Sequence, residues 1–193
     1  MSQTLTLSRV KTKIKTNEVT TVVLSQKNIN IKVREELGQV LLVDASDCFE
    51  MFILASLFQH AMQTHDVIYF EREDDLSCDL FVFNGAITPL DQKDLRKIKS
   101  AIKFVEPEIY KLKLLDSHDE SVWESWQHWK YDEQLRVKAS KDLAIINSSQ
   151  LGFELLFHQC AYLASSYSGH SHFDWYSTKK SIELIIRNIE RNK

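Results

Sequence analysis

Residues 142–190 decide the fold, because they read as strand, helix, polar loop and strand with little sequence between the elements. The apolar run Leu-Ala-Ile-Ile at 143–146 is long enough for a strand and too short for a helix. A helix is expected over 151–166, where apolar residues recur along one side. A second strand is expected at 182–187. Three residues before the helix can each cap it by accepting from the free N–H groups of its first turn: Asn147, Ser148 and Ser149.

The loop between this helix and the last strand reads Gly-His-Ser-His-Phe-Asp-Trp-Tyr-Ser at 169–177. This order of elements, with a G-H-x-H-F-D-type loop closed by the strand Ile-Glu-Leu-Ile-Ile at 182–186, resembles a family of small bacterial immunity proteins. Such proteins are encoded beside polymorphic toxins and neutralise them. The resemblance covers 142–190, about a quarter of the chain. It implies a cognate protein toxin as partner, and it implies no catalytic role for the loop.

The composition agrees with this interpretation. The chain has 193 residues, 44% hydrophobic and 26% charged, as an ordinary globular protein has. Four Gly and two Pro place most residues in regular elements. No linker of Gly, Pro or Ser divides the chain, so residues 1–193 are expected to form a single compact unit.

Charge and hydropathy exclude several partners. A net charge of −3 and a pI near 6.2 argue against a nucleic-acid binder that neutralises phosphates. No apolar run approaches the ~20 residues that span a membrane, and the polar segment 1–15 is unlike a signal peptide. Three isolated cysteines in apolar sequence favour reduced thiols and a cytoplasmic location: Cys48, Cys78 and Cys160.

The chain contains a possible internal repeat. Moving 29–84 forward by 104 residues superimposes it on 133–188 without a gap, with Val33 on Val137, Phe49 on Phe153 and Leu80 on Leu184. Strand, helix and strand patterns stay in phase, so each copy reads as a ββαββ unit. The alternative is two ordinary stretches that align by chance.

The complete pattern predicts an α+β fold with antiparallel sheet packed on helices. Further strands are expected over 5–15, 19–24 and 110–114, where apolar and polar residues alternate. Helices are expected to begin near four positions: Asp47, Pro89, Ser117 and Ser148. At the second of these Thr88 would cap the helix and Pro89 would take its first position.

His170, His172 and Asp174 are the candidate chemical residues. In an extended chain they alternate onto one face, where two imidazoles and a carboxylate could hold a metal or act as acid and base. The alternative function is therefore a small metal-dependent hydrolase. A His-x-His pair needs further ligands, and no second ligand cluster is evident in the sequence. We therefore expect no metal or cofactor and interpret these residues as a polar turn or a partner contact.

Two other features are candidate partner contacts. Trp123, Trp126 and Trp129 follow at spacings of three, which on a helix is more often a core stripe, and Trp129 at the helix end is the one expected to be exposed. The acidic run at 71–75 could meet a basic toxin surface or form a solvated hairpin loop. Its acidic members are Glu71, Glu73, Asp74 and Asp75.

The sequence thus favours an immunity protein that acts by occupancy and not by catalysis. This mechanism needs complementary shape, aromatic anchors and charge, and it needs no catalytic residues. The expected contacts are the acidic run, Trp129 and the loop from His170 to Asp174.

Overall fold

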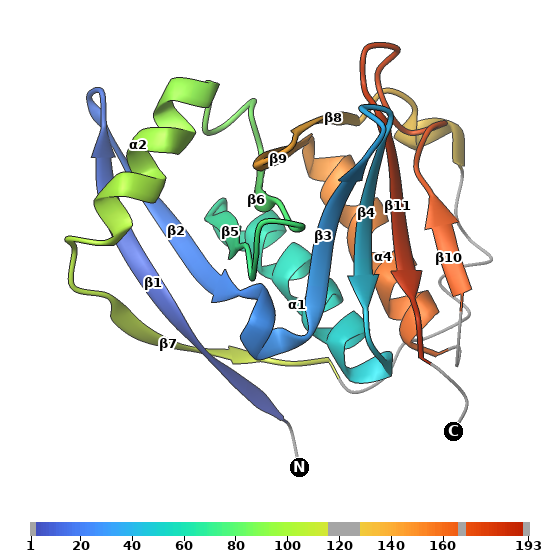
Figure 1. Cartoon of the computed structure of the whole chain (residues 1–193), viewed down its shortest axis with the longest axis horizontal. Coiled ribbons are helices and arrows are strands. Elements are labelled where there is room, and N and C mark those ends of the chain that lie inside the picture. The colour runs from blue at the N-terminus through green and yellow to red at the C-terminus, as the bar shows by residue number, and fades with distance from the viewer. Residues whose placement is uncertain (1–2, 116–127, 166–168, 191–193) are drawn as a thin grey trace.

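The computed structural model describes residues 3–115, 128–165 and 169–190. These residues form an α+β fold, as predicted, and the strands are divided between two sheets and are not antiparallel throughout as expected (Figure 1). The sheets are mixed, because parallel pairs join the antiparallel hairpins. The larger sheet has the order β7 (Glu108–Lys113), β1 (Thr4–Ile14), β2 (Asn17–Ser25), β5 (Val67–Glu71), β6 (Asp79–Phe83), β9 (Leu143–Ser148), β8 (Leu135–Ser140). The smaller sheet has the order β10 (Gly169–His172), β11 (Glu183–Asn188), β4 (Val40–Ala45), β3 (Ile31–Glu36).

The helices described are α1 (Cys48–Thr64), α2 (Gln92–Ile102) and α4 (Gln150–Ala164), with short 3-10 turns η1 (Gln26–Ile29) and η2 (His128–Tyr131). None of these helices has both the length and the apolar character that crossing a membrane requires. The helix expected near Ser117 lies outside the described residues.

The two sheets are connected because each of two units of the chain contributes one pair of strands to each sheet. The first unit consists of β3, β4, α1, β5 and β6, and the second of β8, β9, α4, β10 and β11. Strand β4 pairs in parallel with β11, which places Leu41 opposite Leu184. Strand β6 pairs in parallel with β9, which places Leu80 opposite Ala144. Each sheet therefore contains one hairpin from each unit, and neither unit completes a sheet alone.

The same backbone contact recurs where the two sheets meet. Cys78 N–H donates to Val33 O at 2.8 Å, and Ile182 N–H donates to Val137 O at 3.2 Å. Both donors immediately precede the strand that pairs with the other unit. The two units thus share their order of elements and their pairing. A common origin of 29–84 and 133–188 by duplication stays a prediction, and superposition of the Cα atoms of the two segments tests it.

A single offset of 104 residues does not relate the two units throughout. Phe49 is 43% exposed, whereas Phe153 is fully buried, so the expected match between them is wrong. Met51 and Phe153 are the equivalent helix positions, because each N–H donates to the carbonyl of its helix cap, Asp47 or Ser149, and both side chains are fully buried. One cause is the strand turn, which spans 37–39 in the first unit and only 141–142 in the second.

Helices α1 and α4 begin where the sequence predicts. The Asp47 carboxylate accepts from Phe49 N–H at 2.8 Å, and the Ser149 hydroxyl accepts from Gly152 N–H at 3.0 Å. The helices run antiparallel, since Gln150 at the start of α4 donates to Met62 O near the end of α1.

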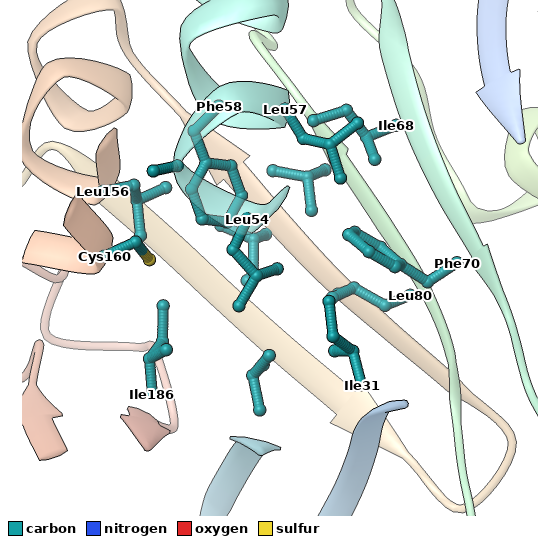
Figure 2. Packing of buried hydrophobic residues seen from close by; sticks show 14 of the residues in the cluster. Ile31, Leu54, Leu57, Phe58, Ile68, Phe70, Leu80, Leu156, Cys160 and Ile186 are labelled. Carbon is teal, nitrogen blue, oxygen red and sulfur yellow. The ribbon is translucent and has the colours of Figure 1, made fainter. Parts of the chain in front are cut away.

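Both helices pack on both sheets and form the main core (Figure 2). Leu54 and Phe58 project from α1 beside Leu156 and Cys160 of α4, and the side chain of Ile186 lies below them. All five side chains are buried. Because each helix is covered on several sides, it is apolar over most of its surface and not along one stripe.

A second core forms where α2 covers the other face of the larger sheet. Leu95 and Ile98 pack in one cluster with Phe81 and Phe83 of β6. The expected cap at Thr88 is wrong, because α2 is capped at Asp91, three residues later. Asp91 and Asp94 satisfy each other's backbone N–H groups, at 2.9 and 3.2 Å, and this reciprocal capping box fixes the helix start.

Leu54 projects from α1 into the main core, so we expect its truncation to lower stability strongly. We expect Leu54→Ala to lower the free energy of unfolding by about 2–5 kcal/mol, because a fully buried leucine leaves a cavity. Phe104→Ala is the matched control: Phe104 is 88% exposed, so its loss should change stability by less than about 0.5 kcal/mol. Urea unfolding followed by circular dichroism measures both, and equal effects would contradict the proposed core.

Candidate functional site

The two histidines lie exposed on β10, the edge strand of the smaller sheet. The rings of His170 and His172 meet edge to face with centroids 5.0 Å apart. His172 Nδ1–H donates to the carboxylate of Glu183 on β11. Across the sheet, His170 is opposite Arg187. The histidines thus belong to the sheet face that no described helix covers, as Figure 1 shows.

Asp174 does not continue the histidine row. Strand β10 ends at His172, and a turn follows in which Tyr176 N–H donates to Phe173 O at 3.2 Å. Phe173 N–H still donates to Leu184 O of β11 at 3.0 Å, but Asp174 O accepts from Ser177 N–H at 3.1 Å and so belongs to the turn. The expected single face of His170, His172 and Asp174 is therefore wrong. Within the described residues, no three His, Cys, Asp or Glu side chains are grouped so that they could hold a metal ion.

The loop at 173–182 is held firmly against β8 of the larger sheet. Leu135 N–H donates to Tyr176 O at 2.9 Å, and Leu135 O accepts from Thr178 N–H at 2.8 Å. The Ser181 hydroxyl accepts from Val137 N–H at 3.0 Å. Backbone bonds at both ends of the loop therefore fix its conformation before any partner binds.

This loop carries Trp175, which is 80% exposed and was not among the predicted contacts. An exposed large hydrophobe also lies nearby in the fold, at the β3–β4 turn. Leu37 is 95% exposed there. Both residues lie at the same end of the smaller sheet. The loop leads into β11 there, and Glu183 N–H at the start of β11 donates to Gln39 O, at the end of the β3–β4 turn, at 2.9 Å. In an extended chain Trp175 would point to the face opposite the histidines, and this alternation gives no indication of its exposure.

The predicted acidic run lies elsewhere, at the end of β5 and in the β5–β6 loop. Glu71, Glu73, Asp74 and Asp75 are all exposed. Two of them form long ion pairs: Glu73 lies 3.9 Å from Lys32, and Asp75 lies 3.7 Å from Arg72. The structure thus separates the acidic run from the histidine strand. The backbone of Trp129 lies in η2, and its side chain, together with Trp123 and Trp126, lies outside the described residues.

Two ion-pair clusters were not predicted, because their members are distant in sequence. Buried Asp44 accepts from Arg187 at 2.6 and 2.7 Å and from Arg34 at 2.7 Å, which ties β4 to both of its neighbours. Burial alone would raise the pKa of Asp44, but the hydrogen bonds from the two arginines outweigh burial and lower it. This cluster lies on the same open face as the histidines, one strand away.

The second cluster joins α1 to the far end of the larger sheet. His60 Nε2 lies 2.9 Å from the carboxylate of Asp66, which also accepts from Arg9 at 3.1 and 3.2 Å. The hydroxyl of Tyr110 lies 3.4 Å from His60 Nδ1. Both His60 and Asp66 are buried. An aspartate, a histidine and a tyrosine in a row resemble an acid–base relay, but the hollows that the described residues form along β9, beside α2 and at the β1–β2 turn are lined by other side chains. Their evident role is to anchor β1 and β7.

Among the carboxyl groups of the described residues, Glu50 is the one whose pKa is raised above its usual value. It is buried in the first turn of α1, where the Ser46 hydroxyl donates to it at 3.1 Å. Burial and, after it, the adjacent Asp47 carboxylate raise the pKa of Glu50 to about 7. The hydrogen bond with Glu50 in turn lowers the pKa of Asp47.

This raised pKa predicts a pH-dependent stability. Glu50 is protonated in both states below about pH 4.3, its usual pKa, so its stabilising effect is complete there and is lost as pH rises through 7. Glu50→Gln cannot ionise. We therefore expect it to exceed the parent in stability at pH 8 by on the order of 1 kcal/mol and to approach it at pH 5. Glu18→Gln, at an exposed position, is the control. Urea unfolding at both pH values measures this, and a parallel pH dependence in parent and Glu50→Gln would contradict it.

Comparisons with known proteins add no assignment to this geometry. No family model matches the chain, and no curated protein and no solved structure matches it either.

Proposed function

We propose that this chain is an immunity protein, which binds a cognate bacterial protein toxin and blocks it by occupancy, without catalysis. The observation that carries the proposal is Trp175, exposed on a loop that is fixed by backbone bonds to another sheet. Tryptophan is the residue most enriched at binding hot spots. A fixed loop loses little conformational entropy on binding, so more of the contact energy remains as affinity.

Leu37 supports the same surface. Its backbone φ is 55°, in the left-handed region that is costly for a side chain with a Cβ, and Gly38 follows at 69°. Two consecutive positive φ values define a type I′ turn, which strongly prefers Asn at the first position. Here that position holds a leucine that is 95% exposed. Both its strain and its exposure are unfavourable in the isolated protein, and burial against a partner would offset them.

The surface proposed for the toxin is therefore one end of the smaller sheet, with Trp175 and Leu37 as anchors. His170, His172 and Asp174 lie at its border as polar contacts. The acidic run at 71–75 is in a different loop, and a role in long-range attraction of a basic toxin suits its exposure, since charges at the border of an interface act mainly on the association rate.

We further propose that the protein acts in the cytoplasm. The three cysteines, all within the described residues, form no disulfide. Burial raises the pKa of the Cys160 and Cys78 thiols, which makes them unreactive core side chains. Reduced, inert thiols of this kind are typical of a cytoplasmic protein.

Co-expression with the toxin encoded by the neighbouring gene tests the proposal. We expect the parent to protect cells and to co-purify with an inactivated toxin domain. Trp175→Ala should weaken the complex by about thirtyfold or more, as for a hot-spot tryptophan. Leu37→Asn should weaken the complex while leaving the free protein as stable or more stable, because Asn suits the turn.

Phe104→Ala is the matched control, since it removes an equally exposed ring far from this sheet end. It should leave the affinity unchanged. The proposal fails if no complex forms and cells die regardless. If a complex forms but neither anchor substitution weakens it, the immunity function stands and the surface assignment is wrong.

A further inference from the structure

Three hollows lie in line along the outer face of β9. They have volumes of about 290, 470 and 280 Å³. The first two share Leu143, and the last two share Arg136 and Asn147. The three hollows therefore adjoin one another along β9, from its first residue to its last, and this row of hollows is called the trough below.

The trough exists because α2 does not cover the whole sheet. Helix α2 and the preceding segment pack on β6 through Leu95, Ile98 and Leu90. Strands β9 and β8 extend the sheet beyond this cover. Leu143 and Ile145 consequently line the central hollow beside Phe83 and Leu90, and they give it an apolar floor.

One wall of the central hollow is cationic. Arg136 and Lys138 stand two residues apart on β8, opposite Asn147 and Ile145 of β9, and both are exposed. Among the described residues no carboxylate lies within 4.0 Å of either cation. Asp91 also lines the central hollow, but its carboxylate accepts from Asp94 N–H at 2.9 Å and lies 3.7 Å from Lys15 Nζ. In a chain of net charge −3, two adjacent cations without a carboxylate neighbour, over an apolar floor, favour an anion.

The polar end of the floor is fixed in place. Asn147 Oδ1 accepts from Gly85 N–H at 2.9 Å. A Cβ on Gly85 would come within 2.2 Å of the Asn147 amide, so only glycine allows the two to lie this close. The orientation of Asn147 is thus set by the fold, between the cations and the end of β6.

We propose that the trough binds an organic anion with a flat apolar body, of the aromatic carboxylate class. The body lies on Phe83, Leu143 and Ile145, and the carboxylate lies against Arg136 and Lys138. The central volume is within the range of small-molecule sites, which combine an apolar lining with a few placed polar groups. A carboxylate suits a guanidinium particularly well because it accepts two parallel hydrogen bonds. This site does not depend on the proposed toxin binding.

Calorimetric titration with 2-naphthoate tests the proposal, and 2-naphthylmethylammonium serves as the probe of equal shape and opposite charge. We expect saturable one-to-one binding of the naphthoate and at least about tenfold weaker binding of the cation. Arg136→Ala combined with Lys138→Ala should weaken naphthoate binding at least about tenfold. Amide NMR shifts on saturation should centre on Leu143 and Ile145.

Lys111→Ala combined with Lys113→Ala is the matched control, because these lysines are also exposed and two residues apart on an edge strand of the same sheet. It should leave binding unchanged. The proposal is overturned if naphthoate shows no saturable binding up to about 5 mM, or if the Arg136 and Lys138 variant, folded by circular dichroism, binds as the parent does. It is also overturned if that variant still binds naphthoate as the parent does but no longer binds the toxin. The trough would then be a protein-docking surface.

Discussion

The parallel pairing of β4 with β11 and of β6 with β9 is the constraint on which the rest of the structure depends. Each pair joins strands from different units, and all four are interior strands of their sheets. Helices α1 and α4 then fill the space that the sheets enclose, and they are apolar on most sides because strands of both units cover them. Such contacts connect residues far apart in the chain, so the main core forms only after both units have been made.

The same pairing explains why the exposed features are rigid. The β10–β11 loop must pass β8 to bring β11 beside β4, and it bonds to β8 on the way. Trp175 is therefore presented by a segment that is part of the framework. Leu37 lies in the turn between β3 and β4, and β4 is the strand that pairs with β11. A surface built in this way suits tight binding, because little ordering remains to be done when a partner arrives.

The trough has a different origin in the same architecture. Helix α2 lies between the two units in the chain, and the core cluster beneath it ends at β9, where Leu143 is buried and Ile145 is only partly buried. The second unit adds β9 and β8 at that limit, with cations on β8 and apolar residues on β9. The smaller sheet has no corresponding helix among the described residues, and its open face is instead occupied by the ion pairs around Asp44.

Local signals in the sequence predicted the elements well. The caps at Asp47 and Ser149 and the hairpin strands follow from side chains and alternation within a few residues. The cap of α2 was misplaced because Thr88 and Pro89 form a strong start signal, whereas the reciprocal bonds of Asp91 and Asp94 are decided only in the folded turn.

Long-range features could not be read from the sequence in the same way. Nothing local indicates that β4 pairs with β11, since parallel pairing leaves no turn signal. The turn that contains Asp174 is held by backbone bonds of Phe173 to Leu184 and of Tyr176 to Leu135, and both partners are distant in the chain. For Leu37 one signal was present: Leu-Gly stands between two expected strands, where Asn-Gly is the usual pair. The exposure of Trp175 had no such signal.

The central claim is that each sheet is complete only when strands of both units pair within it. Native-state hydrogen exchange measured by NMR tests this claim most directly. The account predicts that the slowest amides of β4 and β11 and those of β6 and β9 open with one common free energy, equal to that of global unfolding, and with the same dependence on denaturant. If the smaller sheet exchanged through a separate opening of lower free energy while the larger sheet stayed protected, the two sheets would be independent and the account would be wrong.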